Sequence, residues 1–198
     1  MVQQQLLLDY LALLHKWNRA YNLTAVRDPA QMLNRHLLDS LSIASLVQGQ
    51  RVLDVGTGPG LPGIPLAILF PERQFELLDS NGKKTRFLIE ARAQLGLRNV
   101  EVHCDRVEAL CDERGFDAIT SRTFASLADM AQGCEHLLAP GGKMFAMKGL
   151  YPEQELSQLP KHFIVEACHT LSVPGVDEAR HLMVIASQHS GEHSASDQ

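Results

Sequence analysis

The sequence lacks a hydrophobic run long enough to cross a bilayer, which takes about 18 consecutive apolar residues. The longest candidate, residues 61–70, is interrupted by Pro62 and Pro65. The N-terminus also lacks the basic, apolar and small-residue blocks of a secretory signal peptide. These absences predict a cytoplasmic protein that has no membrane partner.

Cysteine is scarce, and its spacing matches no metal-binding motif. None of the four cysteines forms a C-x-x-C pair: Cys104, Cys111, Cys134 and Cys168. A zinc or iron–sulfur centre is therefore not expected, and free thiols in a reducing compartment are the simpler interpretation. His36 and Asp39 stand three residues apart on an expected helix. We interpret them as an ordinary surface pair, so no metal is predicted.

An excess of positive charge is also missing. The 18 Lys and Arg residues face 23 Asp and Glu residues, and aromatic residues make up only 6% of the chain. This composition excludes a protein that coats nucleic acid through bulk charge. It also argues against a platform of aromatic side chains for single-stranded RNA. Any RNA would have to be bound through a local patch.

The 198 residues are 45% hydrophobic and 21% charged, which is typical of an ordinary globular protein and excludes a mainly disordered chain. Apolar periodicity predicts two N-terminal helices, over residues 3–19 and 29–47, and then an alternation of strands and helices. A break in the second helix near Asp39-Ser40 stays open as an alternative. The expected strands cover residues 52–55, 74–78, 100–102, 116–121, 143–147, 162–170 and 180–187. The expected intervening helices cover residues 61–70, 81–95 and 126–138.

This alternation predicts an α/β fold with a doubly wound, mostly parallel sheet of seven strands. The last two strands have no proper helix between them, which indicates an antiparallel pair at the end of the sheet. We expect one integrated unit in which residues 1–50 form a helical cap and residues 51–187 the main domain. Residues 188–198 are polar and rich in His and Ser, and we expect them to form a flexible tail.

The most informative segment is a glycine-rich loop between the first strand of the sheet and the next helix. It reads Asp54-Val55-Gly56-Thr57-Gly58-Pro59-Gly60-Leu61-Pro62-Gly63. The G-x-G-x-G spacing is not a dinucleotide fingerprint, because Leu61 stands where the third glycine would be, and no Gly-Lys-Ser/Thr follows for a P-loop. The loop lies at the carboxyl end of a strand, where doubly wound folds bind cofactors.

Two carboxylates narrow the choice of cofactor. Asp54 would repel a pyrophosphate and suit an ammonium group, and Asp79, at the end of the second strand, can accept hydrogen bonds from both hydroxyls of a ribose. A ribose combined with an amino-acid ammonium is found in S-adenosylmethionine. The alternatives are that either carboxylate caps the helix that follows it, or that the glycines serve tight packing alone.

The loop, continued by Ile64-Pro65, closely resembles the first motif of the bacterial RsmG (GidB) family. Further motifs match in the order of the family and cover nearly the whole chain: Trp17-Asn18, Tyr21-Asn22-Leu23-Thr24, residues 35–40 (Arg-His-Leu-Leu-Asp-Ser), Leu78-Asp79-Ser80, Ser121-Arg122, Phe124-Ala125, Lys148-Gly149 and Arg180-His181-Leu182. The resemblance implies a Rossmann-like class I methyltransferase fold. It also implies methyl transfer from S-adenosylmethionine to N7 of one guanine in 16S ribosomal RNA.

Loop position and resemblance together give the expected cofactor-binding residues. By resemblance, Val107 and Glu108 hold the adenine ring, and Arg122 contacts both cofactor and substrate. The full expected set is Asp54, Gly56, Gly58, Leu61, Asp79, Val107, Glu108 and Arg122.

Four basic residues fall where expected strands begin or end, and in this topology all four lie at the rim that carries the glycine loop. They are Arg106, Arg122, Lys148 and Arg180. We expect this group to bind RNA, although a single strand-end cation is more often solvated or paired with a nearby carboxylate. Methylation at guanine N7 requires no general base, because this nitrogen carries a lone pair and no proton. Arg122 and Lys148 are the expected catalytic residues, holding O6 or a flanking phosphate and leaving N7 free.

The acidic surplus lies mostly in residues 151–198, a segment that suits contact with basic ribosomal proteins. We therefore expect the substrate to be 16S ribosomal RNA within the small ribosomal subunit or a late precursor. Two other functions stay open. A small-molecule methyltransferase would share the glycine loop without needing four cations at one rim, and a cofactor-binding assembly or regulatory module would bind without turnover.

Overall fold

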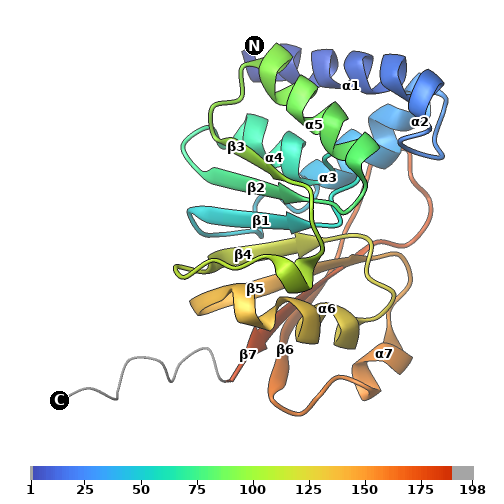
Figure 1. Cartoon of the computed structure of the whole chain (residues 1–198). Helices are drawn as coiled ribbons and strands as arrows, with labels where there is room; N and C mark the ends of the chain where they lie inside the picture. Colours follow the sequence, from blue (N-terminus) through green and yellow to red (C-terminus); the bar gives the residue numbers. More distant parts are fainter. Residues whose placement is uncertain (1, 189–198) are drawn as a thin grey trace.

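A seven-stranded sheet forms the centre of the computed structural model, which describes residues 2–188 (Figure 1). Its strands are β1 (Arg51–Val55), β2 (Gln74–Leu78), β3 (Val100–His103), β4 (Phe116–Ser121), β5 (Leu138–Lys148), β6 (Phe163–Thr170) and β7 (His181–Ser187). They lie in the order β3-β2-β1-β4-β5-β7-β6. The first five strands are parallel, whereas β7 is antiparallel to β5 and β6. The predicted α/β sheet with an antiparallel terminal pair is confirmed.

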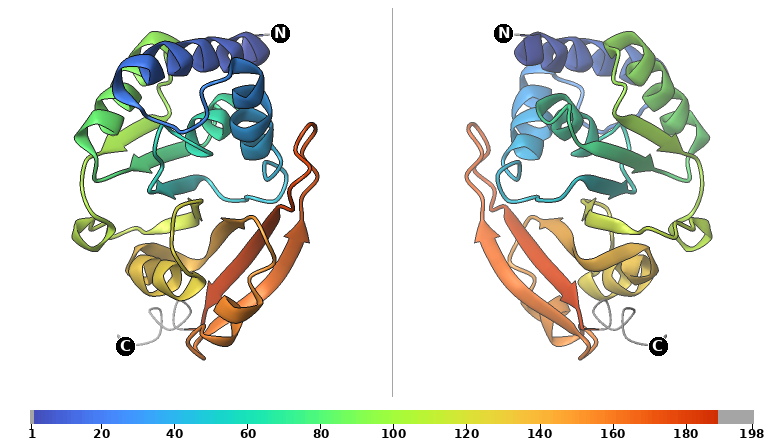
Figure 2. Two further views of the ribbon diagram at one scale, coloured as in Figure 1. Left: turned by 90° about the vertical axis from the view of Figure 1, so that its right-hand side faces the viewer. Right: turned by 90° about the vertical axis from the view of Figure 1, so that its left-hand side faces the viewer.

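Apolar residues at alternate strand positions divide between two cores, because successive side chains point to opposite faces of a sheet. On β1, Val52 belongs to a core that includes side chains of α1, α4 and α5, and Leu53 belongs to a core that includes α6. Helix α1 packs on α4 and α5 (Figure 2). These four helices are α1 (Val2–Tyr21), α4 (Gly63–Leu69), α5 (Gly82–Leu95) and α6 (Leu127–Cys134).

The second N-terminal helix is shorter and less regular than predicted. It consists of α2 (Pro29–Met32), a π-helical segment over Leu33–Leu38 and α3 (Asp39–Leu41), followed by turns instead of helix to residue 47. The start is as expected, because the Asp28 carboxylate accepts a hydrogen bond from the Ala30 amide at 3.1 Å. The α3 helix ends close to the break that the sequence leaves open at Asp39-Ser40. Beyond it the Ser42 hydroxyl donates to the Asp39 carbonyl at 2.6 Å, and the Ala44 amide donates to the Leu41 carbonyl at 3.0 Å in a tighter turn.

Three further boundaries differ from the prediction. Helix α4 begins at Gly63 instead of residue 61, and α6 ends at Cys134 before a 3₁₀ turn over Glu135–Leu137. Strand β5 begins at Leu138, five residues early, because Leu138 pairs with Phe116 before the register shifts. Residues 140–142, whose Pro-Gly-Gly sequence favours a turn, are therefore an irregularity within β5. Two short helices were not predicted, a 3₁₀ turn over Val107–Ala109 and α7 (Glu153–Ser157).

The boundaries proposed for a cap and a main domain, at residues 50 and 187, stay predictions. The tail expected over residues 188–198 lies outside the described residues except for Gln188. Within residues 2–188, no helix has both the length and the apolar character that crossing a membrane requires.

Candidate functional site

Two backbone amides of the glycine loop donate hydrogen bonds to residues at the end of β2. The Gly58 amide donates to Asp79 Oδ2 at 2.9 Å, and the Thr57 amide donates to the Leu78 carbonyl at 3.1 Å. The loop thereby joins the ends of β1 and β2. Gly56 has a φ of 64°, and a Cβ there would lie 2.1 Å from Thr123 Oγ1. Only glycine fits at this position, for both conformational and steric reasons.

Asp54 is fully buried beneath the loop. Its Oδ2 accepts hydrogen bonds from the Thr57 hydroxyl at 2.6 Å and the Gly63 amide at 2.9 Å, and its Oδ1 accepts one from the Thr120 hydroxyl at 3.2 Å. Burial raises the pKa of this carboxyl from 3.8 to about 6, and the three hydrogen bonds and the field of Arg122 oppose the increase. Because Gly63 begins α4, these contacts match the capping alternative. An ammonium contact stays a prediction.

A cavity of about 310 Å³ lies beside the loop, at the carboxyl ends of β1 to β3. It brings together four of the predicted cofactor-binding residues, Gly56, Asp79, Val107 and Glu108. Its full lining is Val55, Gly56, Leu78, Asp79, Ser80, Lys84, Asp105, Arg106, Val107, Glu108, Thr123 and Phe124. Four others in the prediction, Asp54, Gly58, Leu61 and Arg122, are not part of this lining.

Asp79 is buried at the wall of this cavity, and its carboxylate already interacts with two backbone amides and one lysine. Oδ1 accepts a hydrogen bond from the Asn81 amide at 2.9 Å, while Oδ2 accepts the Gly58 amide at 2.9 Å and lies 3.4 Å from Lys84 Nζ. A carboxylate offers about four acceptor positions. One therefore remains for a ligand hydroxyl, and a second becomes available if Lys84 moves away.

A tyrosine that the sequence analysis did not single out ties the N-terminal helix to the glycine loop. The Tyr10 hydroxyl donates a hydrogen bond to the Pro59 carbonyl at 2.7 Å, and both groups are buried. Burial raises the pKa of this phenol, so it stays protonated. In the sequence, Tyr10 is marked only by its position on the apolar face of α1.

Three of the four predicted RNA-binding cations gather at a second, smaller cavity of about 170 Å³. Arg122, Lys148 and Arg180 line it together with Arg35, Asp39, Met147, Gly149, Leu171 and His181. Arg106 instead lines the larger cavity. The two cavities adjoin along the segment after β4, where Arg122 faces one cavity and Thr123 and Phe124 face the other.

A carboxylate partner is present for each of the three cations. Buried Asp39 accepts hydrogen bonds from Arg122 Nη1 at 3.0 Å and from Arg180 Nε at 3.1 Å. Lys148 Nζ lies 2.7 Å from Glu155 Oε2 and donates to the Phe124 carbonyl at 3.5 Å. This is the pairing that the sequence left open as the alternative, so the cavity carries much less net charge than its cations suggest.

The interpretation of His36 and Asp39 as a surface pair is wrong, because both side chains are buried. His36 Nε2 lies 2.8 Å from the Thr24 hydroxyl, and its buried Nδ1 has no hydrogen-bond partner among the described residues. Burial and the nearby Arg122 guanidinium lower the pKa of this imidazole to about 4. His36 is therefore neutral at pH 7. The burial and ion pairs of Asp39 could not be read from the sequence, because its partners Arg122 and Arg180 lie 83 and 141 residues away.

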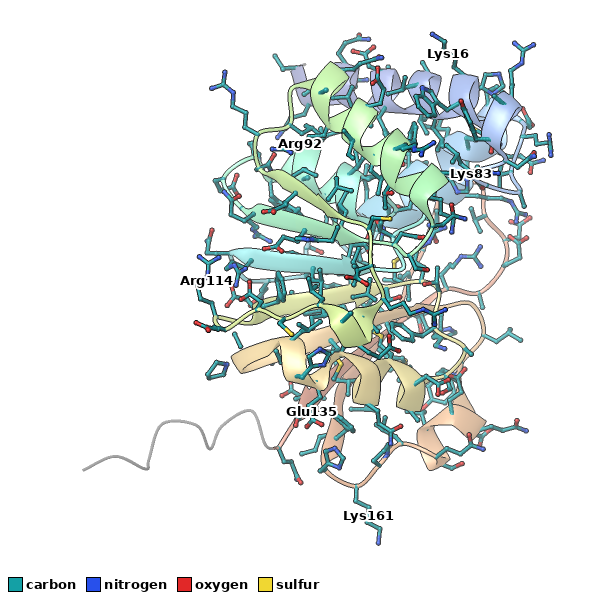
Figure 3. The ribbon with its side chains drawn as sticks, in the orientation of Figure 1. Lys16, Lys83, Arg92, Arg114, Glu135 and Lys161 are labelled. Carbon is teal, nitrogen blue, oxygen red and sulfur yellow. The ribbon has the colours of Figure 1, made fainter. Side chains whose placement is uncertain are left out.

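Lys16, Lys83 and Lys161 do not line either cavity. Figure 3 shows Lys83 projecting from the start of α5, Lys16 from α1, and Lys161 from the opposite end of the molecule. The Lys83 side chain is exposed.

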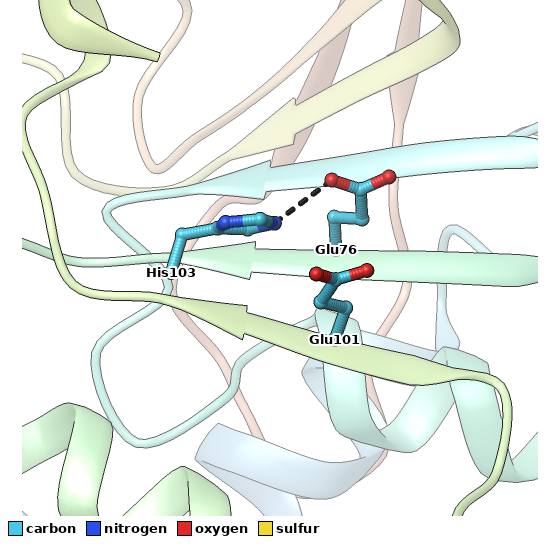
Figure 4. Close-up of side chains that lie close together, drawn as sticks. All are labelled: Glu76, Glu101 and His103. Atoms are coloured by element: carbon cyan, nitrogen blue, oxygen red, sulfur yellow. Dashed lines mark hydrogen bonds and ion pairs between the residues drawn. The ribbon is translucent and has the colours of Figure 1, made fainter. Parts of the chain in front are cut away.

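Glu76, Glu101 and His103 form a cluster of possible metal ligands on β2 and β3 (Figure 4). His103 Nε2 lies 2.8 Å from Glu76 Oε2, and Arg51 Nη2 binds Glu76 Oε1 at 2.9 Å. Arg51 also binds Asp112 at 2.8 Å. Both oxygens of Glu76 therefore have a partner, His103 or Arg51. With Asp112, these residues form a network of ion pairs and hydrogen bonds.

A family model described as rRNA small subunit methyltransferase G, or GidB, matches residues 3–183. The chain belongs to this family. A ribosomal RNA small subunit methyltransferase G of Stutzerimonas stutzeri is 56% identical over 185 residues, which cover 92% of this chain and 86% of the relative. The protein of the same name from Idiomarina loihiensis is 51% identical, over 94% of this chain and 90% of its own length. The family resemblance seen in the sequence is thus confirmed.

Two solved structures have a fold similar to that of this chain. A SAM-dependent methyltransferase from Aquifex aeolicus superimposes with a TM-score of 0.63 at 17% identity, over 80% of this chain and 93% of its own. TrmN from Thermus thermophilus gives a TM-score of 0.61 at 22% identity, over 86% of this chain and 53% of its own. At such identities the likeness concerns the fold alone, and it confirms the predicted Rossmann-like methyltransferase architecture.

Proposed function

We propose that this chain transfers a methyl group from S-adenosylmethionine to N7 of a specific guanine in 16S ribosomal RNA. The observation that carries the proposal is that the consecutive residues 122–124 line two cavities. One cavity presents a buried carboxylate and glycine backbone, and the other presents four cations, Arg35, Arg122, Lys148 and Arg180. Family membership supports ribosomal RNA as the methyl acceptor, because the relatives are named for it.

The larger cavity fits the cofactor. The one free acceptor position of Asp79 suits a ribose hydroxyl, the position now facing Lys84 would take the second, and Val107 and Glu108 form the part of the wall assigned to the adenine ring. The open backbone at Gly58, where a Cβ would meet no heavy atom within 4 Å, leaves room beside the loop. When bound, the cofactor supplies a methyl group already activated by the positive sulfonium.

The chain contributes alignment instead of proton transfer. Guanine N7 has no proton to remove, and neutral, buried His36 does not line either cavity. Arg122 and Lys148 hold guanine O6 or a flanking phosphate, since a guanidinium bound to O6 and N7 together would block the nucleophile. Holding the acceptor in line with the methyl–sulfur bond then lowers the barrier.

The charge balance favours a folded acceptor. The chain has a net charge of −5, and the four cations of the smaller cavity are already paired with carboxylates. Nonspecific affinity for RNA should therefore be weak at physiological salt. We infer that the small ribosomal subunit, or a late precursor, is a better substrate than a short RNA of the same sequence.

The test is methyl transfer from isotope-labelled S-adenosylmethionine to small subunits isolated from cells that lack the gene. Digestion and mass mapping should locate the label on N7 of a single guanine. Label on small molecules but not on RNA would favour the small-molecule alternative, and cofactor binding without transfer would favour a regulatory module. Asp79→Ala, which removes the proposed ribose ligand, should weaken cofactor binding by about 1–3 kcal/mol.

A further inference from the structure

Leu150 and Tyr151 are two neighbouring apolar side chains that the protein leaves in solvent. Their exposed fractions are 81% and 53%. Of the residues that the structure describes, they are the only large exposed hydrophobic residues adjacent in sequence, and Leu150 is the most exposed of them. Single exposed apolar residues are ordinary, whereas grouped ones commonly mark an interaction surface.

The segment that carries them borders the cationic cavity. It connects β5 to α7, directly after Lys148 and Gly149, which both line that cavity. His181, another lining residue, makes an edge contact with the Tyr151 ring at a centroid distance of 5.9 Å. Its Nδ1 also lies 2.8 Å from the Gly149 carbonyl.

The two side chains project from a segment that is anchored on both sides. Lys148 pairs with His181 across β5 and β7, and Pro152 is buried. The Glu153 amide donates to the Tyr151 carbonyl at 3.1 Å. Leu150 and Tyr151 therefore present apolar surface directly after Lys148 and Gly149 and beside His181, three residues that line the cationic cavity.

We propose that Leu150 and Tyr151 pack against RNA bases next to the target guanine, in the space this base leaves when it is unstacked. The inference rests on the proposed function and names the contact that this function needs. A guanine within structured RNA must leave its stack to reach the cofactor. Apolar side chains fill such gaps in other nucleic-acid complexes, and aromatic side chains stack on bases. Phosphates of the same strand can contact the adjacent cations only by sharing or displacing their carboxylate partners, Asp39 and Glu155.

The double substitution Leu150→Ser with Tyr151→Ser tests the contact, because both residues are exposed and the fold does not need them. Methyl transfer to the small subunit should fall about tenfold or more, the equivalent of losing one stacked base. Cofactor affinity and the thermal midpoint should match the wild type. Leu150→Met with Tyr151→Phe keeps the apolar surface and should restore transfer. Ile89→Ser, at a 56% exposed residue on α5, is the control and should have no effect.

A benzophenone amino acid at position 151 identifies the partner directly. Photocrosslinking to the small subunit should link it to nucleotides beside the methylated guanine. A crosslink only to a ribosomal protein, or wild-type transfer by the double serine variant, would overturn the proposal. So would a loss accompanied by weaker cofactor binding. If the wild-type chain itself methylates no RNA, the proposed function fails as well, so the two failures are distinguishable.

Discussion

Replacing Asp54 by asparagine should change how the stability of the protein depends on pH. The buried carboxyl has a pKa of about 6, raised from 3.8. The folded state therefore holds this proton more tightly than the unfolded state does. The contribution of Asp54 to stability is greatest below pH 3.8 and is lost as pH rises through 6. The difference of about two pKa units corresponds to about 3 kcal/mol at pH 7.

Asparagine removes the charge and can retain every hydrogen bond. Its carbonyl oxygen can accept from Thr57 and Gly63, as Oδ2 does now. Its amide can donate to the Thr120 hydroxyl, which lies 3.5 Å from the Leu53 carbonyl and can donate there instead. The variant should thus be more stable than the wild type near neutral pH, by up to about 3 kcal/mol.

Urea denaturation of both proteins between pH 5 and 8 measures the effect. The difference between variant and wild type should grow with pH up to about 7 and then stay level. Taking the difference removes the opposing titration of His36, whose lowered pKa makes the folded state less stable as pH falls from 6.5 towards 4. A difference that does not vary with pH would refute the reasoning.

The same variant distinguishes the two roles that the sequence leaves open for Asp54. If the carboxylate holds the ammonium of the cofactor, calorimetric titration should show weaker binding of S-adenosylmethionine. If it only caps α4, the affinity should stay as in the wild type.

Three further predictions concern contacts of the site. Tyr10→Phe leaves the buried Pro59 carbonyl without its hydrogen bond, which should cost about 1–3 kcal/mol and lower the thermal midpoint by about 2–10 °C; an unchanged melting curve would contradict this. Asp39→Asn removes the negative charge and one of the two acceptors that hold Arg122 and Arg180 and should slow methyl transfer about 100-fold, with cofactor affinity retained; normal turnover would argue against a positioning role. Lys148→Ala should depress transfer with nearly normal cofactor binding in titrations, whereas Lys161→Ala, at a distant lysine, should change neither; an equal loss of both activities would make Lys148 a cofactor or folding residue.

The parts of the fold that follow from local pattern were predictable. Short apolar runs located all seven strands, and the loop between β1 and α4 was evident from its glycines. The predicted start of β5 failed because a register shift decides it, at Leu138. This choice depends on hydrogen bonds that hydrophobic periodicity does not encode.

The site was predictable to the extent that topology determines it. Strand ends placed Gly56 and Asp79 at one cavity, because parallel strands end at the same rim. The separation of Arg106 from the other cations was not predictable, since it depends on where each side chain turns after its strand. Nor was the burial of Asp39, whose surroundings come from β4 and the segment before β7.

The Asp39 contacts also have a consequence for the heat tolerance of the two halves of the site. Arg180 enters the cationic cavity from the connection between β6 and β7, and β6 is an edge strand of the sheet. Edge elements open locally at lower free energy than a sheet centre does. The larger cavity has one side on β1 and β2, which have neighbours on each side, and its Val107–Glu108 side follows β3, the other edge strand. On warming, Arg180 and the Val107–Glu108 wall should therefore loosen before Asp79 and the glycine loop do.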